Sequence, residues 1–484
     1  MAKQSLTEKT ITGVSWNGID KIANYGIGFL VGIVLARLLA PEDYGLIGII
    51  GIFTSVFNII LDSGLNTALI RKENVSHEDY CTVFYTNLIL SVVLTLVLFF
   101  GAPIIADFFK RQELVPLVQV MSFVLIINAF SIVQHARLTR NIDFKTQTKI
   151  SLISHITSGV IGIVMAFTGF GVWALVAQQL SSRLMRTVLL WVYNKWLPTL
   201  VFSWQSFKTL FGFSWKLLVA SVISVLSSQL YQGVIGKCYN PATLGQYTRA
   251  SQYVHLGAST VGDVVLHVSL PVMSSIQNEN ERLLRGYRRI IKTTMLVTFV
   301  LMFGMLACSK SLVLVLIGEK WADCIPMMQI LCLSSALYPL HKININMLTV
   351  HGRSDIQLIL EIIKTVIGFL PLLLGIFVGI YWMLWGSVGV SVIGFFLNSY
   401  YSGKRLNYTS WDQIKDIFPS LLIAIIMALP VYSLSYLPIT VYAILPIQIF
   451  VGFSVAVFLC ELFKKDEYFE IKHNVLMRIS SFFK

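Results

Sequence analysis

The chain has 484 residues, of which 56% are hydrophobic and only 13% are charged, whereas about 25% of residues are charged in an ordinary soluble domain. With a mean hydropathy of +0.74, too few polar residues remain to cover a water-facing surface, which excludes a cytosolic enzyme, a secreted disulfide scaffold and a disordered chain. The net charge of +13 comes from Lys and Arg in short runs between apolar stretches, so it indicates membrane topology rather than nucleic-acid binding.

Polar or Gly/Pro-rich breaks divide the sequence into apolar stretches close to the length of about 20 residues that spans a bilayer. The first stretch is too long for the core of a signal peptide, so we expect it to be retained. There are fourteen stretches, at 13–37, 45–69, 80–100, 115–135, 148–168, 172–193, 211–235, 244–270, 290–309, 325–349, 357–380, 382–401, 417–436 and 439–462. The sequence therefore predicts an all-α polytopic membrane protein of about fourteen transmembrane helices.

Basic residues indicate the orientation of these helices. Most of the 37 Lys and Arg residues fall in alternate loops and in both terminal flanks, and loops rich in Lys and Arg lie in the cytoplasm. Both termini are therefore predicted to be cytoplasmic. No loop is long enough to hold a soluble catalytic domain, so we expect the function to be carried out within the membrane.

Two landmarks recur at nearly one offset, which predicts an internal duplication. Ser15-Trp16 recurs as Ser214-Trp215, and the break that begins with Pro41 recurs at Pro241. Halves of six helices each have the same orientation, as in transporters built from two parallel bundles around a central cavity. The predicted parts are an N-terminal lobe (1–196), an interfacial linker (197–208), a C-terminal lobe (209–405), two extra transmembrane helices (406–462) and a cytoplasmic amphipathic tail (463–484). In the tail, apolar side chains recur at helical spacing at Tyr468, Ile471, Val475, Ile479 and Phe482.

Several strings of residues keep a single order between about residues 10 and 360. They are ARLLAPEDYGLI from Ala36, DSGLNTALI from Asp62, ARLTRNIDFK from Ala136, Gly245-x-Tyr247-x-x-Ala250, PVMSSIQ from Pro271, GEKW from Gly318 and GRSD from Gly352. This set resembles Wzx-type polysaccharide flippases of the multidrug/oligosaccharidyl-lipid/polysaccharide exporter superfamily, in the branch that includes colanic-acid and teichuronic-acid exporters.

The resemblance implies that the protein lies in a bacterial cytoplasmic membrane and flips an undecaprenyl-pyrophosphate-linked oligosaccharide to the outer leaflet. It implies partners in a polysaccharide polymerase and glycosyltransferases. A drug or cation antiporter, or a lipid II flippase, of the same superfamily remains an alternative. A membrane polysaccharide polymerase is another, although the sequence has no Walker A, GxSxG or HExxH motif.

Charged residues within the stretches are the candidate site, because a charge at mid-bilayer costs about 2.5–3.5 kcal/mol on insertion scales. The candidate cations for an anionic cargo head are Lys21, Lys216, Arg249, Lys342 and Lys364, and the candidate anions for ion coupling are Asp20, Asp62, Asp263 and Glu361. We expect no catalytic residue. The six cysteines have no metal-ligand spacing, so we expect no metal and no cofactor.

Each candidate also has an ordinary structural interpretation. Lys216 lies near the cytoplasmic end of its stretch and could extend to the headgroups, and Lys364 could pair with Glu361 one helical turn away. Lys21 and Lys342 lie about 12 Å from the cytoplasmic ends of their stretches, a long reach for a lysine. Asp62 is predicted at a depth similar to that of Lys21, and the two could form a pair whose protonation couples transport to an ion.

Overall fold

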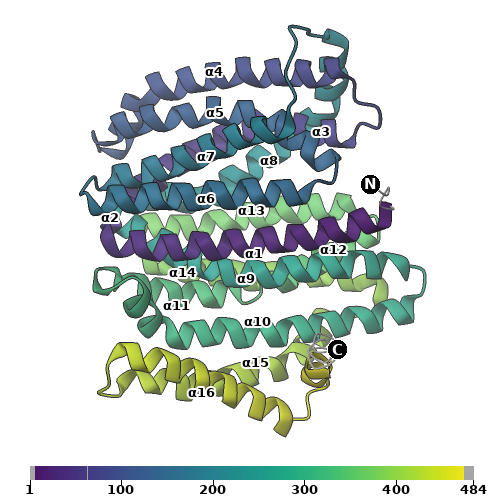
Figure 1. Cartoon of the computed structure of the whole chain (residues 1–484). Coiled ribbons are helices and arrows are strands. Elements are labelled where there is room, and N and C mark those ends of the chain that lie inside the picture. The colour runs from purple at the N-terminus through teal and green to yellow at the C-terminus, as the bar shows by residue number, and fades with distance from the viewer. Residues whose placement is uncertain (1–5, 63, 474–484) are drawn as a thin grey trace, which may run out of the picture. The chain divides into compact units, whose positions relative to one another are not determined.

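The computed structural model describes residues 6–62 and 64–473, and its description covers only the backbone at 6–15, 17–22, 213, 216, 217, 263–268, 270–272 and 354. The described residues are helical, with no strand among them (Figure 1). The chain divides into two compact units, Met1–Gly245 and Gln246–Lys484. The lobe and linker boundaries expected from the sequence remain predictions.

The first unit contains α1 to α8, within which α4, α5 and α7 run side by side (Figure 1). Their bounds are α1 Leu6–Leu38, α2 Pro41–Asp62, α3 Leu65–Arg71, α4 His77–Phe109, α5 Leu114–Arg140, α6 Phe144–Phe167, α7 Val172–Asn194 and α8 Trp204–Cys238.

The second unit contains most of α9 and all later helices, within which α10, α15 and α16 pack together (Figure 1). The α-helices are α9 Pro241–Ser275, α10 Asn280–Leu316, α11 Cys324–Ser335, α12 Tyr338–Val350, α13 Ser354–Phe377, α14 Ile380–Gly403, α15 Ser410–Ser433 and α16 Val441–Leu462. Three short 3₁₀ turns lie between them, η1 Glu319–Trp321, η2 Lys404–Leu406 and η3 Leu434–Tyr436.

Eleven helices of the described residues are long and apolar enough to cross a membrane, counting α2 with α3 and α11 with α12 as single spans. The all-α polytopic fold predicted from the sequence is therefore confirmed. In α1, the apolar segment Ala23–Leu38 is shorter than these spans. Helices α7 and α9 are too polar along their described length to be counted. The count of fourteen spans stays a prediction.

The second predicted stretch is broken rather than continuous. Gly64 lies in the left-handed region with φ 67 between α2 and α3, where glycine carries no steric penalty. At the other end of α3, the Arg140 guanidinium donates hydrogen bonds to the carbonyls of Leu69, Ile70, Lys72 and Glu73. A cation at a helix C-terminus satisfies the orphan carbonyls and opposes the negative end of the dipole.

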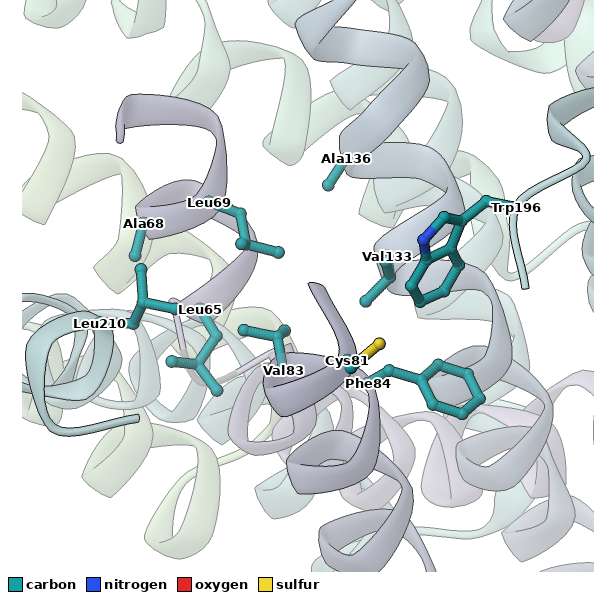
Figure 2. Close-up of a cluster of buried hydrophobic side chains, with 10 residues drawn as sticks. All are labelled: Leu65, Ala68, Leu69, Cys81, Val83, Phe84, Val133, Ala136, Trp196 and Leu210. Carbon is teal, nitrogen blue, oxygen red and sulfur yellow. The ribbon is translucent and has the colours of Figure 1, made fainter. Parts of the chain in front are cut away.

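A buried cluster in the first unit joins the linker between α7 and α8, residues 195–203, to α4. Trp196 packs edge-on against Phe84, with ring centroids 6.0 Å apart, and its indole N–H donates to His77 Nδ1 at 3.2 Å. Figure 2 shows Trp196 above Phe84 and Cys81, with Val133 and Ala136 of α5 on one side. The carbonyl of Trp196 accepts from Gln134 of α5 at 3.0 Å. The linker is therefore part of the folded unit.

Two glycines allow α2 and α9 to meet at their first turns. A Cβ atom on Gly45 would lie 1.8 Å from the Pro241 carbonyl oxygen, and one on Gly245 would lie 1.8 Å from the Pro41 carbonyl oxygen. These four residues belong to the first unit. Each glycine abuts the proline that starts the other helix, which is the contact that a local two-fold relation between duplicated segments would produce.

In the second unit, α15 is joined to α10 by a buried carboxylate. Asp416 accepts from Arg288 Nε at 2.7 Å and Nη2 at 2.8 Å, and Lys292 Nζ lies 3.3 Å away. The Tyr408 hydroxyl donates to the same carboxylate at 2.7 Å. A bidentate arginine contact fixes orientation as well as charge, so Asp416 holds the extra pair of helices in register with α10.

We expect Asp416→Asn to destabilise the protein by about 2 kcal/mol, because charge-assisted hydrogen bonds contribute about 1.5–3 kcal/mol. The melting temperature in detergent should fall. The neighbouring exposed Lys415 offers a matched control, and Lys415→Gln should leave the melting temperature unchanged. An Asp416→Asn protein that melts with wild type would show that α15 docks through its apolar face alone.

The start of the predicted amphipathic tail is helical over 466–473. Glu470 pairs with Arg289 of α10 at 2.6 Å, and Glu461 at the end of α16 pairs with Lys472 at 2.7 Å. Tyr468 packs against the α10–α15–α16 cluster, whereas Val475, Ile479 and Phe482 lie outside the described residues. The tail thus folds back onto the second unit at its first turns.

Candidate functional site

A polar cavity of about 350 Å³ lies between α6 and α7 in the first unit. Serines and a histidine of α6 form one wall, and glutamines, a serine and two arginines of α7 form the other. The lining residues are Ser151, Ser154, His155, Ser158, Gln178, Gln179, Ser182, Arg183 and Arg186. The cavity therefore offers hydroxyls, amides and two guanidinium groups, and no carboxylate is among the described residues that line it.

The two faces of α7 explain why the cavity is polar. Leu184, Val188 and Val192 follow each other at one-turn spacing and are exposed, as expected for a stripe that meets lipid. Arg183 and Arg186 lie on the remaining surface with the glutamines. Because charges facing hydrocarbon are costly, intramembrane arginines face a bundle interior or a water-filled cavity. We therefore interpret the polar face of α7 as the wall of an aqueous path.

The arginines lie deep in their helix. Arg183 is near the middle of α7 (Val172–Asn194), and Arg186 is about 12 Å from its C-terminal end at 1.5 Å per residue. A guanidinium can bind phosphate oxygens through two parallel hydrogen bonds. Two such groups in one cavity can hold an anionic group next to side chains that form hydrogen bonds with hydroxyls.

Helix α1 contributes to the same region. Asn24 Nδ2 donates to Ser151 Oγ at 2.8 Å, while Asn24 Oδ1 is buried and has no hydrogen-bond partner among the described residues. Lys21 precedes Asn24 by three residues in α1, so the two positions share a helix face. The side chain of Lys21 itself lies outside the described residues, as do those of Asp20, Lys216 and Asp263.

A second row of polar side chains follows α2. Thr54, Asn58 and Asp62 recur every four residues, and Asn58 Oδ1 accepts from Asn128 Nδ2 of α5 at 2.6 Å. Asp62 is half-buried at the C-terminal end of α2. Polar groups spaced in this way line one face of the helix, so Asp62 ends a polar row in the interior of the first unit.

In the second unit, Lys342 of α12 is half-buried. Its ammonium lies 5.4 Å from the ring centroid of Tyr338, and no described carboxylate forms an ion pair with it. At about 12 Å from the end of α12, the charge is stabilised by a cation–π contact. No described carboxylate therefore competes for Lys342, and its role in binding an anion stays a prediction from the sequence.

Lys364 is in a different situation. Its ammonium pairs with Glu361 at 2.6 Å, which is the intrahelical alternative considered from the sequence. The Lys364 stem and His341 both lie close to Gly394 of α14. His341 Nδ1 faces the Asn398 amide nitrogen and Nε2 faces Ser391 Oγ, each at 3.2 Å. Asn398 can only donate from that nitrogen, so this geometry fits a neutral imidazole with its proton on Nε2.

Arg249 is separate from these groups. It is buried, with 6% of its surface exposed, and donates to Gln252 Oε1 at 2.8 Å. Its near neighbour Gln246 donates to the Lys320 carbonyl at 2.8 Å, which places this turn of α9 beside η1. These contacts fix this turn of α9 within the second unit, and the role of Arg249 as a candidate cation stays a prediction from the sequence.

Arg183 and Arg186 are not among the site residues predicted from the sequence, although the composition of the surrounding segment contains a signal for them. No Asp or Glu occurs between Asp143 and Asp263. The same segment contains nine basic residues, namely Lys145, Lys149, Arg183, Arg186, Lys195, Lys208, Lys216, Lys237 and Arg249. A segment with basic residues and no acidic ones creates a positive field that attracts anions.

Sequence comparison places residues 34–326 in a match to the family described as polysaccharide biosynthesis protein. Succinoglycan biosynthesis transport protein ExoT of Rhizobium meliloti (strain 1021) is 27% identical over 69% of this chain and 68% of its own length. Teichuronic acid biosynthesis protein TuaB of Bacillus subtilis (strain 168) is 25% identical over 73% of both chains. Lipopolysaccharide biosynthesis protein WzxC of Escherichia coli (strain K12) is 24% identical over 89% of this chain and 88% of its own.

Comparison of the fold identifies solved transporters with the same architecture. The lipid II flippase MurJ in an inward closed conformation matches with a TM-score of 0.76 over 93% of this chain and 98% of its own, at 16% sequence identity. An inward-facing multidrug resistance MATE family transporter of the MOP superfamily matches with a TM-score of 0.60 over 79% and 94%, at 18% identity. At such low identity the likeness establishes the fold alone.

Proposed function

The chain belongs to the polysaccharide biosynthesis protein family, and from this premise we propose that it is a bacterial cytoplasmic-membrane flippase for an undecaprenyl-pyrophosphate-linked oligosaccharide. It transfers the repeat unit of a surface polysaccharide to the outer leaflet by alternating access and catalyses no covalent step. Glycosyltransferases supply its cargo and a polysaccharide polymerase consumes it. Relatives named for succinoglycan transport and for teichuronic acid biosynthesis support this cargo class.

The observation that carries the proposal is the acid-free arginine cavity between α6 and α7. A lipid-linked oligosaccharide has a tail that can stay in the bilayer, an anionic pyrophosphate and a chain of sugar hydroxyls. Arg183 and Arg186 match the pyrophosphate, and the serines and glutamines beside them match the hydroxyls. A cavity built for a cationic drug would instead require carboxylates, and none is among the lining residues that the structure describes.

The proposal assigns roles to the charges found from the sequence. Lys342 in the second unit and Lys21 in the first attract the pyrophosphate, with Lys216, Lys364 and Arg249 as weaker cationic contributors. Asp62, Asp20, Asp263 and Glu361 are proposed for ion coupling, and Glu361 would act through its pair with Lys364.

Deleting the gene tests the function directly. Lipid-linked repeat units should accumulate on the cytoplasmic leaflet while the surface polymer disappears. The likeness in fold to a lipid II flippase supports one second candidate. If the chain instead supported growth of cells depleted of their lipid II flippase and left polymer export unchanged, the polysaccharide assignment would be wrong.

We expect Lys342→Gln to reduce polymer export about tenfold without lowering the amount of protein, because one charge-assisted contact is worth about 1.5 kcal/mol or more. Lys342→Arg should keep more activity, since charge is the requirement. Lys464→Gln, close to the end of α16, serves as the control and should export normally. Equal export by Lys342→Gln and wild type would assign Lys342 to the headgroup region instead.

The orientation is tested by cysteine labelling. Cys238 is exposed, so Cys238→Ser provides the background for new probes. With both termini in the cytoplasm, an impermeant maleimide added outside should modify Gln112→Cys but not Asn280→Cys. The opposite pattern of labelling would reverse the predicted topology.

A further inference from the structure

An apolar groove of about 490 Å³ lies on the first unit, away from the arginine cavity. It is bounded by the α2–α3 break, by one face of α4, and by the linker with the first turns of α8. The lining residues are Ile60, Leu65, Thr86, Ile89, Leu90, Val93, Phe202, Trp204, Phe207, Phe211 and Leu218. Leu65 also belongs to the buried cluster of Figure 2, so the groove backs onto the packed interior.

A ladder of aromatic rings forms one wall of the groove. Trp204 stacks on Phe207 with centroids 5.1 Å apart, and Phe207 stacks on Phe211 at 5.3 Å. The spacing of three and four residues places these rings on one face of α8. Because stacked rings restrict one another, this wall is a preformed surface rather than a set of mobile side chains.

The side chains that line the groove favour a hydrocarbon ligand. Thr86 is the one hydroxyl among the lining residues, and it already donates to the Thr82 carbonyl at 2.7 Å. Ile89 is 65% exposed and Val93 50% exposed. An occupant therefore needs no hydrogen bond inside the groove and gains by covering apolar surface.

The mouth of the groove is cationic. Lys208 Nζ lies 5.6 Å from the centroid of the Trp204 ring, and Lys208 is exposed with no ion-pair partner among the described residues. The nearby Asp79 is already neutralised by Lys72 at 2.7 Å. The N-terminus of α8, with its positive dipole end, is at the same edge.

Hydrogen bonds to α4 hold this edge of the groove in place. The Ser203 amide donates to Thr82 Oγ1 at 3.0 Å, and the Thr199 amide donates to Cys81 Sγ at 3.4 Å. These bonds tie the linker to the first turns of α4. The backbone at this edge of the groove is therefore fixed to α4.

We propose that this groove binds an anionic phospholipid from the leaflet that faces the linker, with an acyl chain along the Trp204, Phe207 and Phe211 ladder and its phosphate beside Lys208. A hydrocarbon chain with one anionic head matches an apolar groove with one unpaired cation at its mouth. The bound lipid seals the junction of α3, α4 and α8. This site is independent of the cargo cavity, so it stands or falls separately from the proposed flippase function.

The site can be tested by photolabelling the full chain in phosphatidylcholine vesicles that contain phosphatidylglycerol with a diazirine on its acyl chain. Peptide mapping should find label in 86–93 and 202–218. One lysine near a membrane surface attracts an anionic lipid by about fivefold in affinity. We therefore expect about fivefold more label from this probe than from the matching phosphatidylcholine probe, and Lys208→Gln should bring the two to equality.

Two variants of α4 give matched steric controls. Val93→Trp should fill the groove and reduce labelling by both probes several-fold, whereas Val97→Trp, one turn further on an equally exposed face, should not. Equal labelling of wild type by the two probes would mean ordinary annular lipid and would overturn the proposal. Displacement of the phosphatidylglycerol probe by an equal amount of polyprenyl phosphate would overturn it too, because the groove would then receive the tail of the cargo.

Discussion

Replacing Arg183 and Arg186 together by glutamine is expected to reduce polymer export about a hundredfold while the protein is made and inserted normally. Each guanidinium offers charge-assisted hydrogen bonds worth about 1.5–3 kcal/mol, or roughly tenfold to hundredfold in affinity. The two residues line one cavity, so their effects should not simply add. Glutamine keeps a polar side chain but removes the charge and the paired donors, so the loss would report the guanidinium contacts.

The measurement is polymer export from a deletion strain that carries each variant, normalised to protein in the membrane. Arg183→Lys should keep more activity than Arg183→Gln but less than wild type, because an ammonium cannot form the paired contact. Lys149→Gln is the matched control, because Lys149 is an exposed cation of α6 that does not line the cavity. Normal export by the double glutamine variant would remove the cavity from the transport path and leave Lys342 as the main cationic candidate.

Sequence reasoning predicted a cationic site within the membrane but did not include Arg183 and Arg186 among its residues. Lys342 was predicted from its depth; it is half-buried beside Tyr338, and its role in anion binding stays a prediction. Lys364 and Glu361 were recognised as a possible pair from their spacing, and the pair forms. In both cases the two residues in contact lie one turn apart on the same helix, so the contact can be predicted from their spacing in the sequence.

The arginine cavity depends on a contact between helices, which no local pattern contains. Arg183 and Ser154 are far apart in the sequence and line one cavity only because α6 and α7 pack side by side. The absence of any acidic residue between Asp143 and Asp263 is a long-range feature of the sequence that distinguishes this region, and it was not used.

The fold, too, has features that a local sequence pattern predicts and features that depend on contacts between distant residues. Hydrophobic stretches predicted the helical membrane fold because each helix has to satisfy its own backbone in lipid. The break between α2 and α3 was missed, since Gly64 in the left-handed region and the carbonyl contacts of Arg140 are needed to stabilise it. A glycine inside an apolar stretch is not by itself evidence of a break.

The recurrence of Pro41 and Gly45 at Pro241 and Gly245 leads to the other large expected effect. Gly45→Ala and Gly245→Ala should each destabilise the protein by about 3 kcal/mol, at the upper end of the usual cost of overpacking. In each case the new methyl group would lie 1.8 Å from a backbone carbonyl oxygen. Backbone atoms cannot move aside as a flexible side chain can, so the first turns of α2 and α9 would have to separate.

Thermal melting in detergent and the amount of protein in the membrane are the measurements. Gly51→Ala is the matched control in α2, because nothing lies within 4 Å of the added Cβ and alanine favours a helix over glycine by about 1 kcal/mol. It should melt at or above the wild-type temperature. Because the contact is reciprocal, the two damaging variants should lower the melting temperature by similar amounts, and the double variant by less than their sum, since a single separation of the two turns relieves both clashes. Wild-type melting of both single variants would mean that the two turns do not approach closely in the membrane, and the local two-fold relation would lose its structural support.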